Sequence, residues 1–381
     1  MRPWERRYVC DRCGAVVQPD AIVWRCTCGG LFVLEHGEVS FPAEAIRQRP
    51  TTMWRYAEAL PFAPASEAPA RVTMGEGWTP LLPIAVGGFG AVAKMEYASP
   101  TLSFKDRGAA VLVAKAIELG AKRLVADSSG NAGAAIAAYA ARAGLPCEVF
   151  VARSTPAGKR AALLAVGAVV REVDGSREAV AAAAMSDVEA TRAFYASHVY
   201  NPFFLEGTKT LAYELWEQLG RAPDVVVLPA GNGTLVLGAL IGFGELKRAR
   251  LIAELPRIIA VQAAGCAPIA RAFHGHTMMV VPVINEGTIA DGIATAEPAR
   301  GDEIVDAVRV SRGTVLTVTD EEIVAAGQSL ARQGLYVEPT AAVPVAGLVQ
   351  AQATGVLGSD GAGEPLVVVP LAGAGLKAAN F

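Results

Sequence analysis

The chain has 381 residues, which at about 150 residues per domain predicts two or three domains. Its 34 Lys and Arg residues against 37 Asp and Glu residues give a net charge of −3, so the composition lacks the basic excess of nucleic-acid-binding proteins. With 52% hydrophobic and 19% charged residues, the chain can bury a large core and is not of the disordered type. We therefore expect no nucleic-acid partner.

Four cysteines, Cys10, Cys13, Cys26 and Cys28, lie in an aromatic and basic segment at residues 1–40. A four-thiolate zinc site normally uses two Cys-x-x-Cys turns, and the second pair here is one residue shorter. A zinc site and a remnant with free thiols are both open interpretations. Because the N-terminus has no apolar secretory stretch, we expect no disulfide framework and a cytoplasmic location.

From about residue 90, short apolar runs alternate with alanine-rich segments. Such runs predict strands at residues 91–95, 123–127, 147–151, 169–173, 225–228, 258–262 and 366–371. The intervening segments predict helices near residues 105–119, 131–143, 157–166, 176–190, 207–219, 234–248, 320–334 and 340–352. Apolar strands that alternate with helices are typical of α/β proteins whose parallel sheets are covered on both faces.

A lysine stands at the start of the first of these helices, in residues 99–108 (Ser-Pro-Thr-Leu-Ser-Phe-Lys-Asp-Arg-Gly). Ser103 is a good N-cap residue, and Lys105 falls in the first helical turn. The helix dipole disfavours a cation there, which would lower the pKa of an amine as a Schiff-base lysine requires. From this segment alone, a solvated surface lysine is the more ordinary interpretation.

Two strand-to-helix turns consist of small residues: residues 128–133 (Ser-Ser-Gly-Asn-Ala-Gly) and residues 229–234 (Pro-Ala-Gly-Asn-Gly-Thr). Small residues leave backbone N–H groups uncovered at a helix N-terminus, where a carboxylate or phosphate can bind. The second turn lacks the Gly-Lys-Ser/Thr ending of a P-loop and the third glycine of a dinucleotide fingerprint. It therefore predicts phosphate binding without nucleotide recognition, although each turn alone could be an ordinary βα connection.

Together with residues 75–81 (Gly-Glu-Gly-Trp-Thr-Pro-Leu), these segments resemble, in their order, the fold-type II pyridoxal-phosphate enzymes of the tryptophan synthase β family. The resemblance covers roughly residues 70–380 and is greatest to threonine synthase and threonine dehydratase. Residues 201–210 are similar to the threonine synthases, whereas residues 288–294 (Thr-Ile-Ala-Asp-Gly-Ile-Ala) resemble the dehydratases more.

The resemblance implies two open, twisted, mostly parallel sheets flanked by helices, preceded by a small zinc-ribbon-like segment. It divides the chain into the zinc-ribbon-like segment at 1–40, a large cofactor-binding domain at 41–97 plus 206–381, and a smaller mobile α/β domain at 98–205. A homodimer is the family expectation.

The resemblance also implies a set of site residues, with Lys105 as the catalytic Schiff-base residue. Its cofactor-binding residues would be Lys105, Phe104, Asn131, Gly231, Asn232, Gly233, Thr234 and Ala372. Its substrate-binding residues would be Ser128, Ser129, Gly130, Asn131 and Ala132. Pyridoxal 5'-phosphate is thus the expected cofactor, and the four N-terminal cysteines could hold Zn²⁺. A bulky residue at Gly233 should weaken cofactor binding and leave the fold intact.

Several residues depart from the family pattern. Phe204 stands where enzymes that use phosphohomoserine have arginine, and Leu235 where they have asparagine, so neither can offer a charge-assisted hydrogen bond to a dianion. Residues 198–200 (His-Val-Tyr) replace a stretch in which serine and asparagine are common. Ala372 replaces a hydroxyl residue beside the pyridine nitrogen, which predicts an unprotonated pyridine.

Other polar residues receive no catalytic role from the sequence. The four histidines lie outside the three motifs, and no histidine metal cluster or Ser-His-Asp set can be argued. Glu338 precedes a predicted core helix, and capping of that helix is favoured over an approach to the cofactor ring.

The predicted function is pyridoxal-phosphate-dependent elimination or replacement at Cβ (or Cγ) of a small L-amino acid through an aminoacrylate-type intermediate. One alternative is threonine synthase acting on O-phosphohomoserine. A second is a catalytically silent paralogue that binds the cofactor, against which the retention of Lys105 and Asn131 counts. The expected partner is a small amino-acid substrate. No membrane partner is expected, because prolines interrupt the uncharged runs at 225–244 and 339–359.

Overall fold

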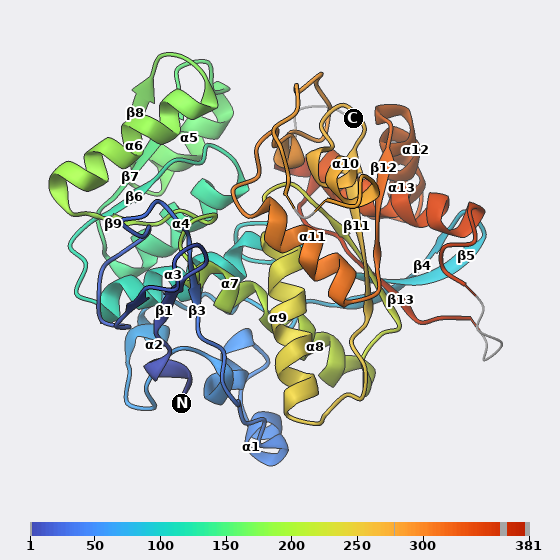
Figure 1. Cartoon of the computed structure of the whole chain (residues 1–381), viewed down its shortest axis with the longest axis horizontal. Helices are drawn as coiled ribbons and strands as arrows, with labels where there is room; N and C mark the ends of the chain where they lie inside the picture. The colour runs from blue at the N-terminus through green and yellow to red at the C-terminus, as the bar shows by residue number, and fades with distance from the viewer. Residues whose placement is uncertain (1, 278, 359–363, 378–381) are drawn as a thin grey trace. The chain divides into compact units, whose positions relative to one another are not determined.

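The computed structural model describes residues 2–277, 279–358 and 364–377 (Figure 1). The chain divides into two compact units. The first unit contains the residues up to Gly77 and Lys105–Thr208, and the second contains Trp78–Phe104 and the residues from Lys209 onward.

A four-stranded parallel sheet with the order β8-β7-β6-β9 forms the centre of the first unit. Its strands are β6 (Leu124–Ala126), β7 (Cys147–Ala152), β8 (Val169–Val173) and β9 (Phe194–Tyr195). The helices that follow Lys105 in this unit are α3 (Lys105–Glu118), α4 (Asn131–Ala143), α5 (Ala157–Ala165), α6 (Arg177–Thr191) and α7 (Phe203–Thr208).

Helices cover both faces of this sheet, because successive side chains of a strand point to opposite sides. Val125 and Phe150 belong to a core cluster with α6. Leu124 and Val149 belong to a second cluster, which includes α3 and α4. Burial on both faces explains why these strands read as continuous apolar runs.

The N-terminal part of the first unit carries a small antiparallel sheet with the order β2-β1-β3. Its elements are β1 (Tyr8–Cys10), β2 (Val16–Val17), β3 (Phe32–Leu34), α1 (Ala43–Gln48) and α2 (Ala68–Val72), with short 3-10 helices at Pro3–Glu5 and Met53–Ala59. α2 packs on α3 and α4. Residues 41–77, which the family resemblance assigned to the large domain, therefore lie in the first unit by their contacts.

The second unit contains a six-stranded sheet with the order β12-β11-β10-β13-β5-β4, in which β4 and β5 pair antiparallel and the other pairs are parallel. Its strands are β4 (Leu81–Val86), β5 (Phe89–Lys94), β10 (Val225–Pro229), β11 (Arg257–Ala263), β12 (Thr314–Val318) and β13 (Val367–Pro370). Its helices are α8 (Thr210–Leu219), α9 (Thr234–Arg248), α10 (Pro268–His274), α11 (Gly301–Val310), α12 (Asp320–Ala331) and α13 (Pro339–Ala353), with 3-10 helices at Glu96–Ala98, Asp291–Ile293 and Gly375–Lys377.

The two sheets flanked by helices confirm the predicted α/β class. The apolar-run criterion missed β4 and β12, which are the two edge strands of the large sheet. Both expose several side chains, and β4 contains Pro83, a residue that edge strands tolerate. The helix predicted at 207–219 is interrupted at Lys209, between α7 and α8. A transmembrane helix is not found in the part of the chain that the structure describes.

Candidate active site

Lys105 is the first residue of α3, as the sequence predicted. The preceding residues are held by backbone contacts within the second unit: Phe104 N–H donates to the Ala372 carbonyl at 3.0 Å, and Ser103 forms an isolated bridge with Gly373. The predicted cofactor-binding residues Phe104 and Ala372 are therefore neighbours.

The predicted capping role of Ser103 is wrong. Its hydroxyl is buried and makes no hydrogen bond to any described residue. The reason is that Ser103 has the extended backbone of a β-bridge and α3 starts two residues later.

An aromatic ring lies beside Lys105. The Nζ atom of Lys105 is 5.7 Å from the ring centroid of Phe204, which α7 carries and which is fully buried. A Cβ atom on Gly108 would lie 2.4 Å from this ring, so only glycine at that position of α3 admits Phe204. A Cβ atom on Gly207 would lie 1.9 Å from the Arg107 carbonyl oxygen, so α7 also approaches the α3 backbone closely.

Residues 128–133 connect β6 to α4 and lie at the carboxyl end of the strand. Gly130 is the N-cap of α4, and no side chain of the described residues caps this helix. A Cβ atom on Gly133 would lie 1.7 Å from the Ser128 carbonyl oxygen, so glycine is required for this tight turn. The structure thus brings the predicted substrate-binding residues together at one helix N-terminus, where backbone N–H groups favour an anion.

Residues 231–234 form the corresponding turn of the second unit, between β10 and α9. Gly233 has a φ of 70°, and its Cβ would lie 2.2 Å from Ile304 Cδ1, while a Cβ on Gly231 would lie 2.7 Å from Ile293 Cα. Thr234 is buried, and the described residues supply no side-chain cap to α9. A bulky residue at Gly233 would disturb the packing itself, so the expectation that it leaves the fold intact is wrong.

Glu338 precedes α13 but does not cap it with its side chain. Its carboxylate instead lies against the backbone of Gly373, where a Cβ atom would lie 2.3 Å from Glu338 Oε1. The favoured capping interpretation is therefore wrong, and the carboxylate lies one residue from Ala372.

Comparison with known proteins identifies the family. Residues 72–371 match the family model "Pyridoxal-phosphate dependent enzyme". The chain belongs to this family. It is 37% identical to a threonine synthase of Methanocaldococcus jannaschii, over 92% of this chain and 89% of that protein. It is 36% identical to a threonine synthase of Methanosarcina acetivorans, over 92% and 88% of the two chains.

Solved structures of pyridoxal-phosphate enzymes share the fold. Maize serine racemase superposes with a TM-score of 0.69 at 25% identity, covering 81% of this chain and 92% of that one. A bacterial threonine deaminase, from the organism abbreviated T.th., superposes with a TM-score of 0.67 at 25% identity, covering 82% and 97%. The predicted resemblance to fold-type II enzymes is confirmed.

The residues at the two turns fit pyridoxal phosphate. The turn at 231–234 combines two glycines that pack too closely for any side chain with the buried hydroxyl of Thr234 at a helix N-terminus. This is the chemistry that a phosphate group needs. In the first unit, Lys105 supplies the amine for covalent attachment, and Asn131 begins α4.

His198 is a residue to which the sequence assigned no role. It is buried beside Phe204, with the two ring centroids 5.8 Å apart and the rings nearly perpendicular. Burial, followed by the charges of Lys105 and Arg177, holds the pKa of His198 well below its ordinary value. The available signal was the departure from the usual serine and asparagine at residues 198–200.

Asp127 precedes the turn at 128–133. Burial is the largest influence on its carboxyl group and raises the pKa, while Tyr195 and Arg177 act in the opposite direction.

The four N-terminal cysteines converge, although the second pair is one residue short. The sulfur atoms of Cys10 and Cys28 are 3.5 Å apart, those of Cys13 and Cys26 are 3.7 Å apart, and all four lie within 4.8 Å of one another. In a tetrahedral site with Zn–S bonds of about 2.3 Å, sulfur atoms are about 3.8 Å apart. The donor set and its spacing therefore fit zinc.

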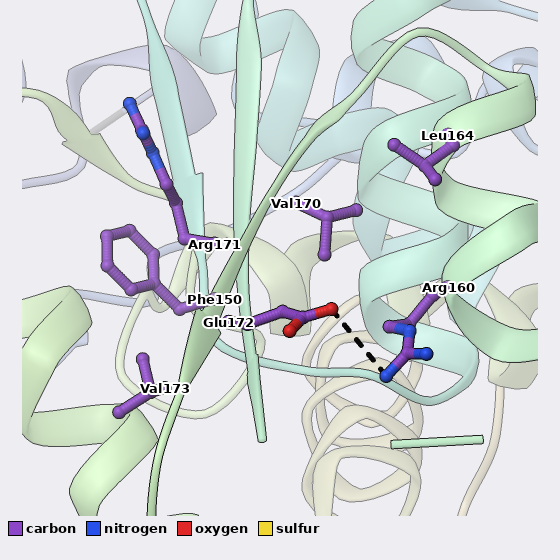
Figure 2. A pocket seen from close by; sticks show the side chains of 7 residues that line it. All are labelled: Phe150, Arg160, Leu164, Val170, Arg171, Glu172 and Val173. Atoms are coloured by element: carbon purple, nitrogen blue, oxygen red, sulfur yellow. Dashed lines mark ion pairs between the residues drawn. The ribbon is translucent and has the colours of Figure 1, made fainter. Parts of the chain in front are cut away.

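A surface hollow of the first unit lies away from these residues (Figure 2). It is lined by parts of α5, β7 and β8, with Arg160 and Glu172 forming an ion pair at 3.6 Å. None of the predicted site residues lines it.

Proposed function

We propose that this enzyme catalyses elimination or replacement at Cβ (or Cγ) of a small L-amino acid whose leaving group is not a phosphate. The observation that carries the proposal is the content of the first unit, where Lys105 begins α3, an uncapped turn at 128–133 can take a carboxylate, and the residue beside the lysine is aromatic.

Each residue has a proposed task. Lys105 Nζ would hold the cofactor covalently and then move the proton at the substrate α-carbon. The backbone N–H groups at 128–133 would bind the substrate carboxylate and orient the molecule. Asn131 would bind the ring hydroxylate of the cofactor, and residues 231–234 its phosphate. When bound, pyridoxal phosphate supplies the electron sink that stabilises negative charge at the α-carbon.

Phe204 and Leu235 support a leaving group other than phosphate. Both are buried and apolar, and each stands where phosphohomoserine-using enzymes have a polar or charged group. A dianion in such surroundings would lack charge-assisted hydrogen bonds from these two positions.

The proposal is tested with the purified holoenzyme and a panel of L-serine, L-threonine, O-acetyl-L-serine, O-phospho-L-serine and O-phosphohomoserine. Keto-acid release is measured by a coupled assay and amino-acid products by chromatography. Release from the unphosphorylated substrates is the expected result. A holoenzyme that converts no member of the panel would identify a silent paralogue and contradict the proposal.

Threonine synthesis from O-phosphohomoserine is the second candidate. The similarity to proteins named threonine synthase, at 36–37% identity over 92% of the chain, favours it. The same panel separates the two, since threonine formation would then exceed all keto-acid release.

We further propose that Cys10, Cys13, Cys26 and Cys28 bind one Zn²⁺ ion. Elemental analysis should find about one zinc per chain, and Cys13→Ser should reduce it. Cys147→Ser, at a buried cysteine outside this cluster, is the matched control and should leave the metal content unchanged.

A homodimer and a cytoplasmic location are proposed from the family alone. Light scattering after size-exclusion chromatography tests the first, and cell fractionation tests the second.

A further inference from the structure

His198 lies at the edge of the sheet where the turn at 128–133 begins. β9 pairs in parallel with β6, and the Ala196 N–H donates to the Val125 carbonyl at 2.8 Å. The carboxyl ends of the two strands therefore meet at one edge, so residues 197–201 leave the sheet beside the turn. In open α/β sheets, ligands bind outside the carboxyl ends of the strands.

The imidazole has a hydrogen-bonding atom that the protein does not use. His198 is 6% exposed, and its Nδ1 atom is buried without a hydrogen-bond partner among the described residues. Buried polar atoms in native proteins nearly always have a partner, and an exception calls for an explanation. A ligand that supplies the partner is one explanation.

The neighbours of the imidazole place it in the candidate site. Its ring contacts the ring of Phe204 at 5.8 Å between centroids, and Lys105 Nζ lies 5.7 Å from the same Phe204 ring. A neutral hydrogen-bonding group, an aromatic ring and an amine thus come together from the segment after β9, from α7 and from α3.

We propose that His198 hydrogen-bonds the Cβ or Cγ substituent of the amino-acid substrate and selects an uncharged hydroxyl or acyl group over a phosphate. This inference rests on the proposed function. A neutral imidazole offers one donor and one acceptor and no positive charge, so it satisfies a hydroxyl better than a dianion. The low pKa of His198 keeps the ring neutral at pH 7.

The test compares two substrates that give the same keto acid in the holoenzyme. L-Serine gives pyruvate and ammonia, and β-chloro-L-alanine with one water gives pyruvate, ammonia and HCl. Chloride leaves without needing a hydrogen bond from a neutral side chain. We expect His198→Leu to lower kcat/KM for L-serine by about 10-fold to 100-fold and that for β-chloro-L-alanine by less than about 3-fold.

Two further variants define the cause. His198→Asn keeps a hydrogen-bonding side chain and should restore part of the preference for L-serine. Ser197→Ala removes a hydroxyl that accepts from the Val199 and Tyr200 N–H groups at 3.4 Å, so it perturbs the same segment without changing the imidazole. It should leave the ratio of the two kcat/KM values unchanged.

A structural role is separated by stability. Because Nδ1 has no partner among the described residues, His198→Leu should keep or raise the thermal midpoint and retain the cofactor absorbance. A lower midpoint with equal losses on both substrates would overturn the inference, as would the same change of ratio in Ser197→Ala.

The failure of the proposed function has its own signature. A wild-type holoenzyme that acts on neither substrate overturns the proposed function and this inference together. A wild-type enzyme that acts on both, with the ratio unchanged in His198→Leu and His198→Asn, overturns this inference alone. A higher kcat/KM for O-phospho-L-serine than for L-serine in the wild type also overturns it.

Discussion

Lys105 and Phe204 form the part of the candidate site in which single residues matter most. The cation lies 5.7 Å from the aromatic ring, an arrangement that holds the amine without neutralising it. Gly108 makes room for the ring, since any Cβ there would overlap it. The catalytic role of Lys105 stays a prediction that chemistry can test directly.

We expect Lys105→Ala to lose all borohydride-trappable cofactor and all turnover, because no other amine would replace its Nζ. Peptide mapping by mass spectrometry after reduction checks the position of the adduct in the wild type. Lys122→Ala, at an exposed lysine of the same unit, should behave as the wild type. A reduced adduct on a different lysine would show that the assignment is wrong.

His198 makes stability depend on pH in a definite direction. Its pKa is well below 6.5 in the folded chain, so below pH 6.5 the unfolded chain binds a proton there and the folded chain does not. The free energy of unfolding should therefore fall as the pH drops, by up to about 1.4 kcal/mol per pH unit from this group. Above pH 7 the residue is neutral in both states and contributes nothing.

His198→Leu should remove this contribution, so its stability relative to the wild type should rise between pH 7.5 and pH 5. Urea unfolding of both proteins at several pH values measures the difference, and pH effects of other groups cancel. A difference independent of pH would contradict the burial of a neutral imidazole.

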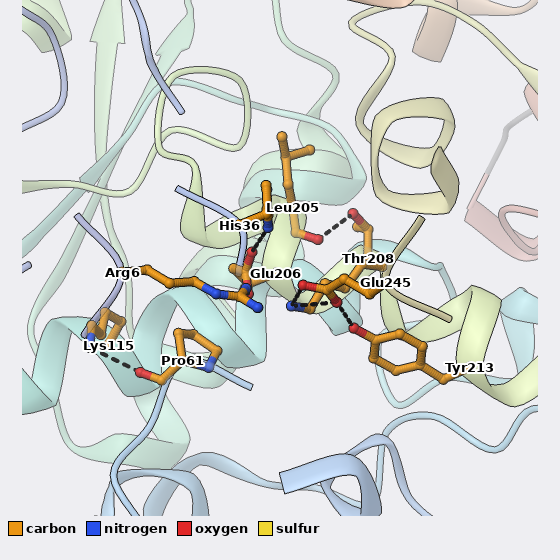
Figure 3. A network of polar contacts seen from close by, with 10 residues as sticks. Arg6, His36, Pro61, Lys115, Leu205, Glu206, Thr208, Tyr213 and Glu245 are labelled. Atoms are coloured by element: carbon orange, nitrogen blue, oxygen red, sulfur yellow. Dashed lines mark hydrogen bonds and ion pairs between the residues drawn. The ribbon is translucent and has the colours of Figure 1, made fainter. Parts of the chain in front are cut away.

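At the scale of elements, α7 is held by the N-terminal segment of the same unit. Arg6 Nη1 donates to Glu206 Oε2 at 2.7 Å with both side chains 1% exposed, and His36 Nδ1 lies 3.8 Å from Glu206 Oε1 (Figure 3). The ring of Tyr8 packs against Phe203 at 5.6 Å. The segment that carries the cysteines thus supports the short helix that carries Phe204.

Glu206→Leu should destabilise the protein by about 3–5 kcal/mol, because it leaves the Arg6 guanidinium buried without its carboxylate. Arg6→Met combined with Glu206→Leu should be less destabilised than Glu206→Leu alone, since the double variant buries no lone charge. Denaturant unfolding gives both values. Arg47→Ala, which breaks an exposed pair with Glu44, is the control and should change stability by less than about 1 kcal/mol.

At the scale of the whole molecule, substrate choice follows from how many anions the chain can satisfy. Phosphohomoserine carries a carboxylate and a phosphate. The turn at 128–133 can take the first, while Phe204 and Leu235 replace groups expected at the second. Each lost charged hydrogen bond costs about 1.5–3 kcal/mol.

We therefore expect kcat/KM for phosphohomoserine to be lowered by roughly two to four powers of ten, at about 1.4 kcal/mol per decade, relative to an enzyme with both polar groups. Steady-state kinetics on the wild type and on Phe204→Arg check this. A value for phosphohomoserine above those for threonine, serine and phosphoserine would show that other basic residues hold the phosphate.

The family and the elements around the site could be predicted because their signals are local in the chain. Lys105 at the start of α3, the turn at 128–133 before α4 and the turn at 231–234 before α9 are each one contiguous segment. A strand, a run of small residues and a helix fix such a turn through its own backbone, so spacing alone identifies it. The edge strands β4 and β12 escaped because they are not apolar on both faces.

Only the tertiary structure decided which distant residues meet. The four cysteine sulfurs converge despite an irregular spacing, Arg6 pairs with Glu206 across 200 positions, and His198 lies against Phe204. The Glu338 carboxylate turns to Gly373 instead of capping its helix, which its sequence position did not reveal. Sequence patterns report the backbone of a segment and which face is buried, whereas the partner of a buried polar group depends on how helices and sheets pack. That is why the cofactor family could be read from the chain, and why the candidate role of His198 required the fold.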